Sequence, residues 1–160
     1  MFAEYNRWMN EKLFAAAAQL TDEQRKADLG AFFKSIHATF EHVLGGDRRW
    51  LQRFRGEPVT ADFPGGPRYS NFEELRAERA RFDAEIIAWS QGVTNDWLAK
   101  PFIWTTVTGL SFTHPGFAVV AQFFNHQTHH RGQITTLLTQ LGVDVGVTDL
   151  PLLPLLNEPA

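Results

Sequence analysis

The stretch FFNHQTHHRGQITTLLTQL, residues 123–141, decides the fold, because it combines a clear helical period with three of the six histidines of the chain. At about 100° per residue, Phe123, Ile134 and Leu141 fall on one apolar stripe. Pro115 suits the first turn of a helix and Gly142 suits its end. We therefore predict a long helix over residues 115–141 with one face buried.

Three segments before this helix show the same period. We expect them to form helices over residues 2–20, 31–54 and 70–91. Capping-box pairs mark two of the boundaries, Thr21 with Gln24 and Ser70 with Glu73. A loop rich in proline and glycine, from Gly56 to Tyr69, separates the second segment from the third.

The remaining segments complete the predicted fold. Residues 101–113 are β-branched and aromatic around Gly109, which predicts a small hairpin. The proline-rich end DLPLLPLLNEP, residues 149–159, cannot continue a helix, and we expect it to lie across the other helices as an apolar strap. The fold class is therefore all-α: one domain over residues 1–160, folded as an antiparallel up-and-down four-helix bundle with a small β-hairpin before the last long helix.

Composition narrows the function classes. The formal charge is −3 and the basic residues are scattered, so we expect no nucleic-acid partner. No run of about 18 apolar residues occurs, and charges interrupt the N-terminal stretch, so we expect no membrane span, no signal peptide and a cytoplasmic location. Cysteine is absent, so a transition-metal site would have to use imidazole and carboxylate ligands.

The histidines separate by helical face. His126 and His130 are four residues apart and lie at the edge of the apolar stripe and inside it, whereas His129 lies on the opposite, polar face. On the second helix, His42 lies at the margin of the apolar stripe beside small residues that leave room for a ring, and His37 projects with charged residues toward solvent.

Two interpretations of the inward histidines are open. Buried histidines are commonly ordinary core residues with backbone or side-chain partners. Three of them near one another, His42, His126 and His130, would each need a partner, at a cost of about 1–3 kcal/mol per unmet group, whereas one metal ion satisfies all three.

Three motifs carry a resemblance to a known family. They are YNRW at residues 5–8, SIHATFEHVLGGDRRWL at residues 35–51 and FNHQTHHRGQ at residues 124–133. With them the chain resembles the DinB family of YfiT-like, DNA-damage-inducible proteins, which are unrelated to the DNA polymerase of the same name. The resemblance implies a four-helix bundle, a homodimer, and metal ligation by one histidine of the second helix and two of the last, here His42, His126 and His130.

An open three-histidine site predicts a metal-dependent enzyme. Three protein ligands with a free position are typical of catalytic sites. Water or a small thiol in that position leads to hydrolysis or S-transfer, and relatives that resemble thiol-dependent transferases favour a low-molecular-weight thiol. We expect one divalent transition metal, Zn, Ni or Fe, and a small-molecule substrate. The alternative is a non-catalytic metal-binding or dimerising stress-response module.

Three further residues are candidates for a catalytic role. Gln127 and Gln133 could orient an imidazole or bind substrate, or they could simply bond neighbouring backbone. Asp47 is an acid on the apolar stripe of the second helix and needs a partner, for which we consider Asn6, Arg7 and Arg131. Asp47 fits a structural ion pair better than a catalytic role, because such pairs also perturb buried acids.

Overall fold

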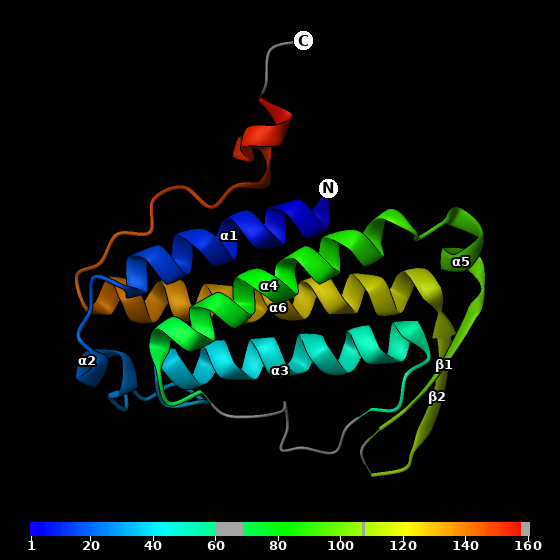
Figure 1. The fold of residues 1–160 in the computed structure, drawn as a ribbon, viewed down its shortest axis with the longest axis horizontal. Coiled ribbons are helices and arrows are strands. Elements are labelled where there is room, and N and C mark those ends of the chain that lie inside the picture. Colours follow the sequence, from blue (N-terminus) through cyan, green and yellow to red (C-terminus); the bar gives the residue numbers. More distant parts are fainter. Residues whose placement is uncertain (60–68, 107, 158–160) are drawn as a thin grey trace.

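Four long helices pack side by side in the computed structural model, which describes residues 1–59, 69–106 and 108–157 (Figure 1). They are α1 (Phe2–Ala17), α3 (Ile36–Arg55), α4 (Phe72–Gln91) and α6 (Gly116–Gln140). Two short helices and an antiparallel hairpin join them: α2 (Asp22–Lys26), α5 (Asn95–Ala99), β1 (Pro101–Thr105) and β2 (Ser111–Pro115). The predicted helical bundle with a small hairpin is confirmed. None of the helices described is both long and apolar enough to cross a membrane.

The directions of the helices differ from a simple up-and-down order. α3 and α4 are parallel neighbours, because Asp47 pairs with Arg79 and, further along both helices, Arg55 pairs with Glu85. α1 and α6 also run parallel, whereas α3 and α6 run antiparallel. The connection between α3 and α4 must therefore span the bundle. Its centre, residues 60–68 of the predicted proline- and glycine-rich loop, lies outside the described residues.

The starts of two helices differ from the prediction. α3 begins at Ile36 rather than near residue 31, because the Ser35 side chain caps it and the preceding Lys34 has a left-handed φ of 67°. α4 is capped by Asn71, whose side chain accepts two backbone N–H groups, and not by the predicted Ser70 box. The Thr21 capping box is confirmed, but it opens the short helix α2.

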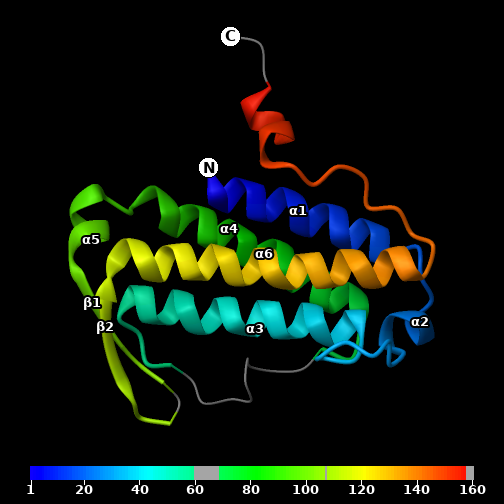
Figure 2. The same ribbon diagram turned by 180° about the vertical axis from the view of Figure 1, so that it is seen from behind.

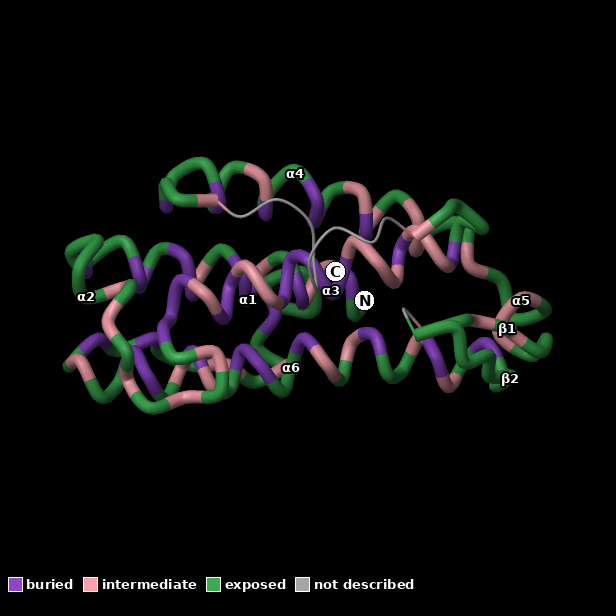
Figure 3. Tube along the Cα trace, turned by 90° about the horizontal axis from the view of Figure 1, so that it is seen from below, coloured by how far each residue is buried: buried purple, intermediate pink, exposed green. Residues whose placement is uncertain are grey.

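Buried residues recur along the long helices and meet between them (Figure 3). At the hairpin end, the Phe54 ring stacks on Trp89 at 4.7 Å and meets Phe123 edge-on at 5.6 Å. At the other end, Phe14 stacks on Phe40 at 3.9 Å. Aromatic contacts of this kind at both ends hold the long helices together, and the polar groups described below lie between them.

The C-terminal segment follows α1 and then leaves the bundle (Figure 2). The Tyr5 hydroxyl donates to the Thr148 carbonyl at 2.5 Å. Beyond it, two 3-10 turns, η2 (Leu150–Leu152) and η3 (Pro154–Leu156), project outward, with Leu155 54% exposed. The strap predicted over residues 149–159 is therefore found only in part: Leu153 is buried, whereas Leu152, Leu155 and Leu156 are exposed, and residues 158–159 lie outside the described residues.

Candidate metal site

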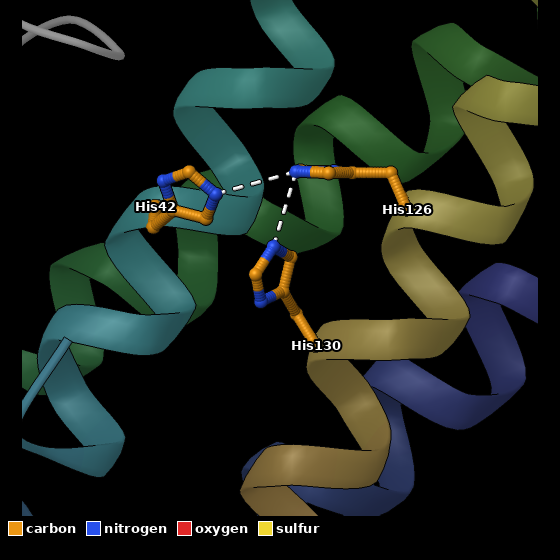
Figure 4. Close-up of side chains that lie close together, drawn as sticks. All are labelled: His42, His126 and His130. Atoms are coloured by element: carbon orange, nitrogen blue, oxygen red, sulfur yellow. Dashed lines mark hydrogen bonds between the residues drawn. The ribbon is translucent and has the colours of Figure 1, made fainter. Parts of the chain in front are cut away.

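The three inward histidines converge between α3 and α6. His42 comes from the first turns of α3, and His126 and His130 lie one turn apart on α6 (Figure 4). His126 Nε2 lies 3.3 Å from His42 Nε2 and 3.1 Å from His130 Nε2. One nitrogen from each ring lies within 4.8 Å of the others. Ligands of a tetrahedral zinc at about 2.0–2.1 Å are about 3.4 Å apart, so the two nitrogen pairs that include His126 are spaced as ligands of one ion would be.

A glycine on α3 makes room for one of these rings. A Cβ atom built on Gly46 would lie 3.0 Å from His126 Cε1, which is closer than ordinary van der Waals contact. Small residues near His42 were predicted to leave space for a ring. Gly46 provides that space, but the ring that uses it is His126 from the facing helix.

The rings are neutral at physiological pH. Burial, with a smaller contribution from neighbouring positive charge, lowers the pKa of His42 to about 3 and that of His126 to about 4. Burial also lowers the pKa of His130. Neutral imidazoles keep the lone pair that a metal needs. Within the described residues, the Nδ1 atoms of His42 and His126 have no hydrogen-bond partner.

Gln133 contacts one of the three histidines. Its Oε1 atom lies 2.8 Å from His130 Nδ1. A carbonyl oxygen can only accept, so this contact holds the proton on Nδ1 and leaves the Nε2 lone pair facing the other histidines. Gln133 thus contacts one of the rings that it was predicted to orient, and its role stays a prediction.

Phe33 covers the cluster from the segment before α3. Its ring stacks on His42 at 3.9 Å and meets His130 edge-on at 5.5 Å. Beside it lies a pocket of about 350 Å³, lined among others by Phe33, Ser35, Glu41 and His42. The sequence analysis did not identify Phe33 as a neighbour of the histidines, because it lies before the capped start of α3.

Asp47 belongs to a buried polar layer that joins the four long helices. Its Oδ2 accepts from Arg79 at 2.6 Å, and Arg79 also donates to Asp83 at 2.8 Å. The layer is completed by Asn6 and Asn10, which donate to Asp83, and by Arg131, which donates to Asn6. Burial raises the pKa of Asp47 to about 6, against the opposing charge of Arg79.

The partner of Asp47 is therefore Arg79, and the predicted partners Asn6, Arg7 and Arg131 were wrong. Arg79 lies four residues from Asp83 on the apolar face of α4, and this charged pair was the signal that could have identified it. Gln127 is also buried and lies beside Asp47, where it lowers the pKa of that carboxyl group. Its amide atoms have no partner of standard geometry within the described residues, so it does not orient a histidine there.

His129 and His37 were both predicted to face solvent, and the structure confirms this for His129 alone. His129 is exposed, as predicted. His37 was predicted to be solvated, but it is only 4% exposed, and its Nε2 lies 2.6 Å from the Tyr69 carbonyl oxygen. The prediction was wrong because it considered the helix alone, whereas the chain returning at Tyr69 covers that face.

Comparisons with known proteins agree with this architecture. The chain is 27% identical over 153 residues to Protein DinB of Bacillus subtilis (strain 168), an alignment that covers 91% of this chain and 87% of that protein. The sequence model of the DinB family matches residues 1–159. With this match over nearly the whole sequence, the chain belongs to the DinB family.

Proposed function

We propose that this protein binds one divalent transition metal through His42, His126 and His130, and uses it for chemistry on a small molecule. The observation that carries the proposal is the spacing of the ring nitrogens. His126 Nε2 lies 3.1 Å from His130 Nε2 and 3.3 Å from His42 Nε2, and one nitrogen from each of the three rings lies within 4.8 Å of the others. Neutral rings support it, because no proton has to be displaced at neutral pH.

The donor set fits a borderline metal. Three imidazoles and no thiolate suit Zn, Ni or Fe, which are the metals we propose. Three protein ligands leave part of the coordination sphere for a substrate. When bound, the cation would supply Lewis acidity and lower the pKa of water or a thiol, which yields a nucleophile for hydrolysis or S-transfer.

The residues around the histidines have distinct roles in this proposal. Gln133 fixes the tautomer of His130, and Phe33 shields His42 from water. The pocket of about 350 Å³ beside His42 is of a size for a small molecule. Since the chain has no cysteine, any thiol must come from a low-molecular-weight compound. Asp47, held by Arg79, stabilises the bundle and is not assigned a catalytic step.

Elemental analysis of the purified protein tests the metal site. We expect about one metal ion per chain in the wild type and a loss of metal in His126→Ala. His129→Ala is the matched control, because His129 is on the same helix and exposed. Equal metal content in both variants, or a wild type that takes up no Zn, Ni or Fe, would refute the proposal.

Two further measurements separate the alternatives. A catalytic ion should leave a folded, inactive protein after chelation, whereas a purely structural ion in a non-catalytic module should take much of the stability with it. Activity without any added thiol would argue for hydrolysis over S-transfer.

The homodimer also stays a proposal, and light scattering during gel filtration tests it.

A further inference from the structure

The four arginines of α3 divide between two faces of the helix. Arg48 and Arg55 face α4 and pair with Glu78 and Glu85. Arg49 and Arg53 lie on the other face and are half-buried. Within residues 1–59, 69–106 and 108–157, neither of these two forms an ion pair with a carboxylate.

Arg49 lies on the same face of α3 as the metal site. Positions 42, 46, 49 and 53 recur at three- and four-residue intervals, so they form one stripe along the helix. Gly46 in this stripe is the residue that approaches the His126 ring.

Arg53 has partners among the described residues, whereas Arg49 has none there. Arg53 donates from Nη2 to the Thr105 carbonyl at 3.2 Å and lies over the rings of Trp50 and Trp104, at 5.1 and 5.5 Å. It therefore holds the hairpin against α3. For Arg49 no hydrogen bond, ion pair or ring contact exists among the described residues.

The two lysines that line the pocket beside His42 are paired with carboxylates. Lys26 pairs with Asp22 at 2.7 Å, and Lys34 lies 3.5 Å from Asp28. Arg49 instead has no carboxylate partner among the described residues, and it is half-buried, which lowers its pKa. Charged groups that lose water normally gain a partner, so this position is suited to an incoming anion.

We propose that Arg49 is the anion-binding residue of the histidine site, and that the substrate is a small molecule that carries a carboxylate. A guanidinium offers two parallel N–H donors and one positive charge, which match a carboxylate in geometry and charge. Seven residues along a helix separate Arg49 from His42 by about 10 Å at the backbone, and the long Arg side chain spans part of this distance. The carboxylate should therefore lie a few bonds from the atom that reacts. This inference rests on the proposed metal-dependent function.

Two thiols that differ in charge test the inference. 3-Mercaptopropionate carries a carboxylate, and 3-mercaptopropionamide replaces it with a neutral amide of the same shape. Each is titrated into the cobalt-loaded full-length protein, and binding is followed by the thiolate-to-cobalt absorption. The readout is the ratio of the two dissociation constants, measured in the wild type, Arg49→Met and Arg55→Met. Arg55→Met removes an exposed charge from the same helix and controls for net charge.

We expect Arg49→Met to reduce the preference for the carboxylate about tenfold, whereas Arg55→Met keeps the wild-type ratio. Arg49→Lys should restore part of the preference, and rising salt should weaken it in the wild type. Cobalt content, measured first for each variant, separates the failures. A wild type without cobalt refutes the metal site itself. A cobalt-loaded protein whose ratio is unchanged in Arg49→Met, or which binds both thiols equally, overturns the anion-binding role alone.

Discussion

Gly46 faces the His126 ring across the interface of α3 and α6. A methyl group added at Gly46 should therefore displace that one ring and leave the other two histidines in place. The new Cβ would lie 3.0 Å from His126 Cε1, and ordinary contact begins at 3.4 Å. The ring must therefore move by about 0.4 Å. Metal–nitrogen distances tolerate about 0.2 Å, so this shift is larger than the site can absorb. We expect Gly46→Ala to bind metal about tenfold more weakly, or worse, as when residues that orient ligands are changed.

The matched control is Gly132→Ala. Gly132 lies in α6 near His130, and a Cβ there meets no atom within 4 Å. Alanine is favoured over glycine inside a helix by about 0.5–1 kcal/mol, so this variant should gain stability and keep the wild-type metal affinity. Competition with a chromophoric chelator measures affinity, and denaturation of the metal-free proteins measures stability. Wild-type metal affinity in Gly46→Ala would refute the inferred geometry of the site.

Three further predictions concern the buried polar layer around Arg79, the protonation of His42 and the Phe33 ring that covers the histidines. Arg79→Leu leaves two buried carboxylates without their cation and should lower the free energy of unfolding, measured in urea, by about 3–5 kcal/mol. Arg81→Leu removes an exposed arginine that pairs with two half-buried glutamates on the same helix, and it should cost less than about 1 kcal/mol. Equal costs would contradict the role of the buried layer. Burial lowers the pKa of His42 from 6.5 in the unfolded chain to about 3 in the folded, metal-free protein. Between these two pH values the unfolded chain binds more protons than the folded protein. The contribution of neutral His42 to the stability of the fold is therefore complete above pH 6.5 and is lost as the pH falls toward 3. Denaturation of the wild type and His42→Gln at pH 7 and pH 5 should show this extra loss in the wild type alone, and parallel curves would contradict it. Phe33→Ala should release metal to a chelator faster at unchanged stoichiometry, whereas Phe32→Ala, at an 85% exposed position, should not; identical release rates would show that the Phe33 ring does not shield the site.

Helical periodicity was sufficient to predict the long helices and the facing of most histidines, because both depend on residues within a few turns of one another. His126 and His130 are placed by a single helix, so their convergence was predictable once the stripe of that helix was known. His42 required that two helices meet, which the family resemblance supplied. The N-caps at Ser35 and Asn71 moved the helix starts by a few residues, since several polar residues near each start could serve as the cap.

Contacts between distant segments were not predictable in the same way. The Asp47–Arg79 pair joins two residues that lie 32 positions apart in the sequence, on different helices, and no local spacing marks it. The parallel course of α3 and α4 depends on where the chain returns after residue 56, which composition does not reveal. His37 is buried because of the Tyr69 carbonyl, and a single-helix projection contains no information about that segment.

The buried layer of Asn6, Asp47, Arg79, Asp83 and Arg131 has a consequence for how a metal would enter. Sliding one helix by a turn would separate buried charges from their partners, so the layer opposes longitudinal slippage of α3, α4 and α6. His42, five residues from Asp47, is thereby kept level with His126 and His130 before any ion arrives. Ion capture then demands small ring rotations rather than ordering of the chain, and its entropic penalty should be correspondingly low.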